Sequence, residues 1–236
     1  MNFYLTTLVK LLTGVPLLLQ LVSLSVSLGA LLAVALALML RSSLSPLVWI
    51  GRAYVFVFRG TPLLVQLFCI YYGLAQFGAI RNSFLWPILR DPFWCTILAL
   101  TLNTAAYGAE IVRGGLQAVP HGQIEAARAA GMSGVLLFRR IIFPIALRQA
   151  LPVYGNELIL MVKATSLASI VTLMEVTGIA YALASETYRH VEILACAGLI
   201  YLSINFLLTR GLALIEHRLS AHMRLPKLVT VDATHY

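Results

Sequence analysis

The decisive stretch of this sequence is Glu125-Ala126-Ala127-Arg128-Ala129-Ala130-Gly131, followed after nine residues by Ile141-Ile142-Phe143-Pro144. It lies between long apolar segments and is itself polar and rich in alanine. A short helix of small residues held between two membrane spans suits docking onto a protein outside the bilayer. A solvated loop has the same composition, so composition alone leaves both interpretations open.

The composition around this stretch is that of a membrane protein. The chain has 236 residues, of which 60% are hydrophobic and 11% charged, and its mean hydropathy is +0.89. A soluble domain carries about a quarter charged residues. Several apolar runs reach the ~20 residues that a helix needs to cross the hydrocarbon core.

The apolar runs predict an all-α integral membrane protein, a single domain over residues 1–236. We expect a five-span helical bundle in which residues 1–16 form a short interfacial helix and 172–189 lie against the bundle. Residues 114–144 form the loop that carries the alanine-rich helix, and the tail 222–236 is loose. The spans are expected near residues 17–40, 54–77, 93–111, 150–170 and 192–214.

Basic residues predict the orientation of the bundle. Twelve of the 17 Lys and Arg residues fall on one side of the predicted spans and four on the other. The richer side is cytoplasmic by the positive-inside rule. The N-terminus is then periplasmic, and residues 112–149 and the C-terminus are cytoplasmic. The net charge of +8 therefore reflects orientation in a lipid membrane, and no nucleic-acid partner is expected.

Motifs for chemistry are missing from the sequence. There is no G-x-x-x-x-G-K-[ST] nucleotide loop, G-x-G-x-x-G, H-E-x-x-H or G-x-S-x-G. His121, His190 and His217 are scattered, which disfavours a membrane-embedded enzyme. We expect no catalytic residue, metal or cofactor, so the energy for active transport must come from a partner or an ion gradient.

Local signals outline the docking segment. Residues 123–130 predict a short helix that stops at Gly131, because glycine accepts the left-handed conformation of a helix cap. Glu125 and Arg128 are placed for charged contacts at the edge of a groove. Pro144 marks the return to the membrane.

This segment resembles the EAA loop of ABC-importer permeases, whose pattern is EAA, three residues, Gly, nine residues and I-x-L-P. The one departure is Phe143 in place of Leu. In that family the loop forms a coupling helix that sits in a cleft of the ATPase subunit. The resemblance thus implies that the ATPase contacts this chain through Glu125, Ala126, Ala127, Arg128 and Gly131.

Other stretches resemble the polar amino acid branch of the same family, with permeases for histidine, lysine, arginine and ornithine and opine permeases as the most similar subgroup. The resemblance implies the type I importer permease fold in a bacterial inner membrane. It also implies three partners: a second permease subunit, an ATPase dimer and a periplasmic binding protein. The matching stretches are Arg59-Gly60-Thr61-Pro62 with Gln66, Ala105-Ala106-Tyr107 with Glu110 and Arg113-Gly114-Gly115, Gly155-Asn156-Glu157, and Lys163 with Thr165-Ser166-Leu167.

Charged residues inside the fourth predicted span are candidates for substrate binding, because a charge within the bilayer normally faces a bundle interior or water. Glu157 suits the cationic group of an amino acid, and Lys163 suits a carboxylate. Six residues separate them, about 9 Å along a helix and on different faces, so they do not pair directly. A structural hydrogen bond is the alternative for Glu157 and for Asn156, and a contact to the partner permease is the alternative for Lys163.

Further polar residues lie near span ends. Glu110 and Arg113 are spaced for a local ion pair, with a gate as the alternative. Arg59 opens the second predicted span just before Gly60 and Pro62, a helix break that suits either a cavity wall or packing. Small residues in the first span form a stripe expected to pack against another helix: Ser23, Ser27, Ala30, Ala33 and Ala37.

Together these features predict the permease subunit of an ATP-driven importer for a polar amino acid, with a basic one favoured, or for an opine. An ion-coupled secondary amino acid transporter is the alternative. Such transporters usually need more spans and internal repeats.

Overall fold

The computed structural model describes residues 2–219, which form helices joined by short turns with no strand among them. The helices are α1 (Asn2–Leu12), α2 (Val15–Leu40), α3 (Ser45–Gly60), α4 (Leu63–Phe68), α5 (Gly78–Arg81), α6 (Trp86–Leu89), α7 (Pro92–Gln117), α8 (His121–Ala129), α9 (Gly134–Leu137), α10 (Phe143–Ala164), α11 (Val176–Thr187) and α12 (His190–Leu219). π-Helical turns extend α4 over Cys69–Gly73 and join α9 to α10 over Phe138–Ile142, and 3-10 turns cover Leu74–Gln76 and Thr165–Val171. The tail predicted to be loose, 222–236, lies outside the described residues.

Three helical segments in the described part are long and apolar enough to cross a membrane: Phe3–Leu40, Pro92–Gln117 and His190–Arg218. Two bent pairs raise the number to five if each pair is one span, and five is the number that the sequence predicts. The first pair joins Ser45–Gly60 to Leu63–Gln76 at 106°, and the second joins Gly134–Val171 to Val176–Thr187 at 49°.

The second predicted span, 54–77, is not one straight helix. The chain turns by 106° where α3 ends and α4 begins, because Pro62 has no N–H to continue α3 and Thr61 is extended. The helix also begins nine residues earlier than predicted, at Ser45. Arg59 is therefore the penultimate residue of α3, about 20 Å along the helix from Ser45, rather than opening a span.

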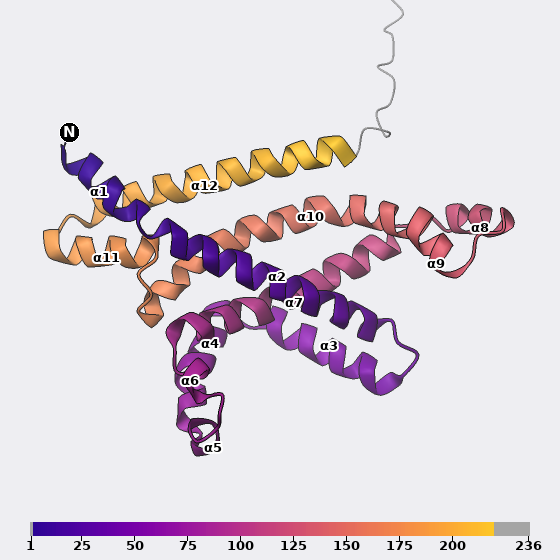
Figure 1. Ribbon diagram of the computed structural model, residues 1–236, viewed down its shortest axis with the longest axis horizontal. Helices are drawn as coiled ribbons and strands as arrows, with labels where there is room; N and C mark the ends of the chain where they lie inside the picture. The colour runs from indigo at the N-terminus through magenta and orange to yellow at the C-terminus, as the bar shows by residue number, and fades with distance from the viewer. Residues whose placement is uncertain (1, 220–236) are drawn as a thin grey trace, which may run out of the picture.

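Helix α7 forms the centre of the molecule, between α2 and α10 (Figure 1). It approaches α2 closely. A Cβ atom added at Gly29 would lie 2.2 Å from the Thr104 methyl group, and one added at Gly108 would lie 2.8 Å from the Ala33 Cβ. Small residues are therefore required where these two helices cross.

The small-residue stripe predicted for the first span is only partly right. Ala33 and Ala37 are buried, but Ser23 and Ser27 are exposed. The buried stripe instead runs through Ser25 and Gly29 to Ala33 and Ala37 at a spacing of four residues. Composition alone could not choose between these faces, because serine and alanine are common on both sides of this helix.

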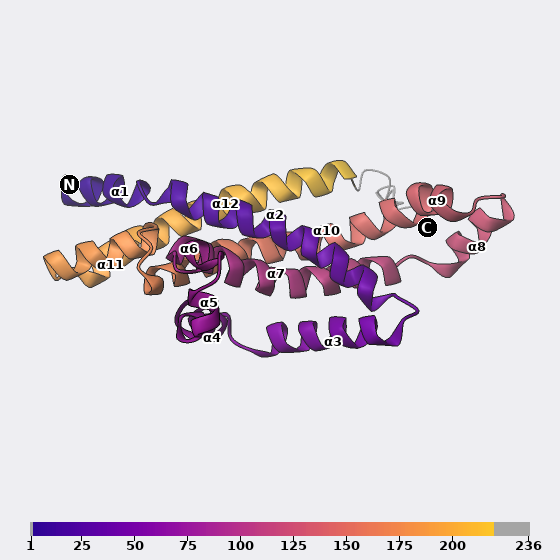
Figure 2. The same ribbon diagram turned by 60° about the horizontal axis from the view of Figure 1, so that its bottom comes forward.

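The two ends of the bundle carry different elements. Helices α1 and α11 lie at one end and α8 with α9 at the other, as Figures 1 and 2 both show. The segment 172–189, expected to lie against the bundle, contains α11, which packs against α1 and α12. Its N-terminus is capped by the fully buried Glu175, which accepts hydrogen bonds from the Gly178 N–H (2.9 Å) and the Tyr201 hydroxyl (2.7 Å).

Candidate functional site

The break between α3 and α4 is held by a buried amide. The Gln66 Nε2 donates to the Phe58 carbonyl (2.8 Å) and to the Thr61 carbonyl (3.1 Å) and hydroxyl (2.8 Å). Phe58 would have bonded the N–H of residue 62, which proline lacks. The spacing of four residues from Pro62 to Gln66 thus has a physical reason, since one side chain satisfies the carbonyl groups that the break leaves free.

Helix α7 secures this arrangement from the other side. The Asn103 Nδ2 donates to the Gln66 Oε1 (3.0 Å) and to the Phe58 carbonyl (3.3 Å), and both amide side chains are buried. The first turn of α4 is thereby fixed against α7, and Leu63 lines a cavity beside Asn103.

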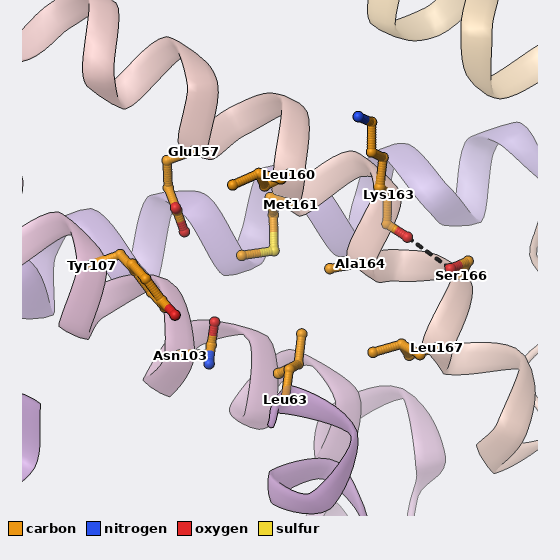
Figure 3. A pocket seen from close by; sticks show the side chains of 10 residues that line it. All are labelled: Leu63, Asn103, Tyr107, Glu157, Leu160, Met161, Lys163, Ala164, Ser166 and Leu167. Atoms are coloured by element: carbon orange, nitrogen blue, oxygen red, sulfur yellow. Dashed lines mark hydrogen bonds between the residues drawn. The ribbon is translucent and has the colours of Figure 1, made fainter. Parts of the chain in front are cut away.

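That cavity has a volume of about 420 Å³ and lies between α4, α7 and α10. Glu157 is the one acidic residue among those that line it. In Figure 3 the Glu157 carboxylate points toward Tyr107 and Asn103 on α7. Glu157 is buried, and its Oε1 accepts a hydrogen bond from the Thr104 hydroxyl at 3.0 Å.

The other two predicted substrate residues are placed differently. Lys163 borders the same cavity, but it is exposed and extends away from Asn103 and Tyr107 (Figure 3). Asn156 is also exposed and lines an adjoining cavity of about 500 Å³. Tyr107, Glu157 and Leu160 line both cavities, so the two spaces meet at Glu157. As expected, Glu157 and Lys163 form no ion pair within the described residues.

The second cavity is bordered by a cluster of charges from α3 and α7. Arg113 donates from Nε to the Glu110 carboxylate (3.0 Å) and pairs with it again through Nη2. The local ion pair predicted for Glu110 and Arg113 is confirmed. Arg59 approaches the same carboxylate at 4.0 Å, and its guanidinium lies 5.2 Å from the centre of the Tyr107 ring.

Sequence reasoning missed Asn103 and Tyr107 as cavity residues and Thr104 as the partner of Glu157. A signal was present: Asn103, Tyr107 and Glu110 are spaced i, i+4 and i+7, which places them on one face of a helix. That polar face in an apolar span marks the side of α7 toward the cavities.

Helix α8 ends as the sequence predicts. Gly131 has φ +81°, its N–H bonds the Arg128 carbonyl (2.9 Å), and the Met132 N–H bonds the Ala127 carbonyl (2.9 Å). This pair of bonds is a Schellman motif, which needs a left-handed residue at this point. An added Cβ at Gly131 would meet nothing within 4 Å, so glycine is needed for its conformation and not for space.

The exposed side of α8 is flat. Gly122, Ala126 and Ala129 are spaced i, i+4 and i+7, and all three are exposed. On the opposite side, Ala127 is buried and Ile124 half-buried. Of the predicted coupling residues, Ala127 is therefore buried in a segment that packs against α9 and the turn that follows it, while Glu125, Ala126 and Arg128 are exposed. Such a surface lets another protein approach the helix backbone closely.

A first prediction concerns the break. Gln66→Leu leaves the Phe58 and Thr61 carbonyls without their donor, at a cost of about 1–3 kcal/mol. We expect the unfolding temperature of the purified protein in detergent to fall by about 2–10 °C. The control is Gln76→Leu, an exposed glutamine with one weak bond to the Tyr72 carbonyl (3.4 Å). Equal unfolding temperatures for both variants would refute a holding role for Gln66.

Comparison with known proteins identifies the family of this chain. Residues 25–221 match the model of the family described as "binding-protein-dependent transport system inner membrane component". The chain belongs to this family. The permease is therefore a transport subunit of an ABC importer in the inner membrane, and ATP hydrolysis takes place on a separate subunit.

Individual relatives agree with this assignment. The permease is 61% identical over 210 residues to the octopine transport system permease protein OccM of Rhizobium meliloti, covering 89% of this chain and 86% of that protein. It is 44% identical over 179 residues to the arginine ABC transporter permease protein ArtM of Escherichia coli strain K12, covering 75% and 80%. The crystal structure of an amino acid ABC transporter with histidines matches with a TM-score of 0.80 and 38% identity, covering 89% and 94%. The predicted type I importer fold is confirmed.

Proposed function

We propose that this permease imports a basic amino acid or an opine, and that Glu157 binds the cationic group of the substrate. The observation that carries this proposal is the position of Glu157, the one acid lining the cavity between α4, α7 and α10. Octopine and arginine are the compounds named for two of its relatives. Asn156 and Lys163 border the same connected space and are proposed as further substrate contacts.

The mechanism we propose is alternating access driven through α8. The helix would sit in a groove of an ATPase dimer, with Glu125 and Arg128 in charged contacts at its edge. Closure of the ATPases on ATP would move α8, and the bundle would open from one side to the other. The flat exposed side of α8 supports this role, because small residues allow close approach.

The proposed assembly contains a second permease subunit, identical or homologous, and a periplasmic binding protein. The N-terminus would be periplasmic, and α8 and the C-terminus cytoplasmic, with the five crossings given above. Two observations support this orientation: α1 and α8 lie at opposite ends of the bundle (Figures 1 and 2), and basic residues are concentrated on the side of α8.

The function is tested by uptake into proteoliposomes that contain the co-purified transporter, with the binding protein supplied outside. We expect uptake of L-arginine or octopine that needs ATP inside and survives a protonophore, with L-glutamate transported at least about tenfold more slowly. Uptake that needs a proton or sodium gradient and no ATP would contradict the proposed coupling through α8. Uptake of neither compound would contradict the proposed substrate class.

A further inference from the structure

Arg59 is a charged residue near the end of α3, beside Tyr107 and Glu110 of α7. It is the penultimate residue of α3, and its side chain is 44% exposed, toward the cavity that also holds Asn156 and Glu157. Charges in membrane-spanning helices are costly and are retained for contacts with substrate, ions or other charges. Arg59 is therefore expected to have an anionic partner.

Glu110 is not a sufficient partner for Arg59. The Glu110 carboxylate is already bonded by Arg113 through two nitrogen atoms, and Arg59 reaches it only at 4.0 Å. No hydrogen bond from the Arg59 guanidinium is present within residues 2–219. The cluster of two arginines and one glutamate keeps a net positive charge, and Arg59 is the member that borders the cavity of Glu157 without a close partner.

The cavity thus has walls of opposite charge. Glu157 lies on α10 and Arg59 near the end of α3, and both line the same space of about 500 Å³, which Glu110 also lines and Lys163 does not. An amino acid has matching groups, a cation at one end and a carboxylate at the other. We propose that Arg59 binds the carboxylate of the substrate while Glu157 binds its cationic group. This inference rests on the proposed function.

The surroundings of Arg59 suit this task. A guanidinium has paired donors that match the two oxygen atoms of a carboxylate, which the ammonium of lysine lacks. The Tyr107 ring, 5.2 Å from the Arg59 guanidinium carbon, limits the orientations of the group. Because Gln66 and Asn103 hold the break that follows Arg59, the end of α3 is fixed relative to α7.

The test compares two ligands that differ in the carboxylate. L-Arginine and L-argininamide are titrated by calorimetry against the complete transporter in detergent, without binding protein. Arg59→Gln should weaken binding of L-arginine about tenfold or more, the effect of losing one charge-assisted hydrogen bond, and change L-argininamide less than about twofold. The affinity of Arg59→Lys for L-arginine should lie between those of the unmodified protein and Arg59→Gln. If the glutamine variant does not assemble, the lysine variant gives the same comparison of the two ligands.

The matched control is Arg52→Gln, an exposed arginine on the same helix that does not line the cavity of Glu157. It should leave both affinities unchanged. If Arg59 has a purely structural role, Arg59→Gln should weaken the binding of both ligands equally, and that result would overturn the inference. Unchanged binding of L-arginine by Arg59→Gln would overturn it too. If the unmodified transporter binds neither L-arginine nor octopine, the proposed substrate class fails first. If the transporter binds octopine but not L-arginine, the variants are compared with octopine as the ligand. An unchanged affinity of Arg59→Gln for octopine would then refute the inference.

Discussion

An arginine in place of Ala126 is expected to lower ATP-driven uptake at least about tenfold while leaving the permease folded. Ala126 is the middle residue of the flat side of α8, with Gly122 and Ala129 one turn before and after it, and it is exposed. Exposed substitutions of this kind change stability by no more than about 0.5 kcal/mol. A long cation would instead hold the ATPase groove away from the helix. Losing a central interface contact costs about 2 kcal/mol or more, so uptake should fall at least about tenfold.

The readouts for Ala126→Arg are uptake, co-purification of the ATPase and the unfolding temperature. Ala79→Arg is the control, an exposed alanine in the short helix α5 that should behave as the unmodified protein. Normal uptake by Ala126→Arg would remove α8 from the coupling path.

A second substitution tests the end of the same helix. Gly131→Val places a branched residue at φ +81°, whereas Gly131→Asn is tolerated better there. We therefore expect the valine variant to lose coupling and the asparagine variant to keep most of it. Equal activity of the two variants would show that the cap does not position α8.

Replacing Glu157 with glutamine is the second change with a large expected effect. Glutamine has nearly the same shape and still offers an oxygen atom to the Thr104 hydroxyl, so the substitution removes little besides the negative charge. A cationic substrate would lose a charge-assisted contact worth about 1.5–3 kcal/mol. We expect the apparent affinity for L-arginine in uptake to fall about tenfold or more, with assembly and basal ATP hydrolysis kept.

Two controls separate charge from structure at this position. Thr104→Val removes the hydrogen bond to Glu157 but keeps the carboxylate, and it should lower uptake less than Glu157→Gln. Glu186→Gln removes an exposed carboxylate from α11 and should have no effect. If Thr104→Val and Glu157→Gln lower uptake equally, the carboxylate serves packing between α7 and α10 rather than substrate.

Local features were predictable where neighbours in the sequence are also neighbours in space. The helix that stops at Gly131 and the ion pair of Glu110 with Arg113 are of this kind, because their partners lie within five residues. The helical membrane class follows from hydropathy for a similar reason, since it depends on the average over each span. The spacing of the motifs also predicted the family of ABC-importer permeases.

Contacts between distant segments were not predictable in this way. Gln66 stands out in the sequence only as the last residue of a motif, yet in the fold it bonds Phe58, Thr61 and Asn103 around a sharp turn. The sequence likewise suggests a stripe of small residues on α2 but not which side meets α7. In a span where nearly every residue is apolar, hydropathy does not distinguish the face toward lipid from the face toward protein.

What the sequence by itself determined is the membrane class, the alanine-rich helix with its glycine cap and the membership in the importer family. The tertiary structure alone decided that Arg59 lies near the end of α3 instead of at the start of a span, and that it shares a cavity with Glu157. The physical reason is that helix caps and spans arise from short-range bonding and average polarity. The meeting of two charges 98 residues apart depends instead on how α3, α7 and α10 pack.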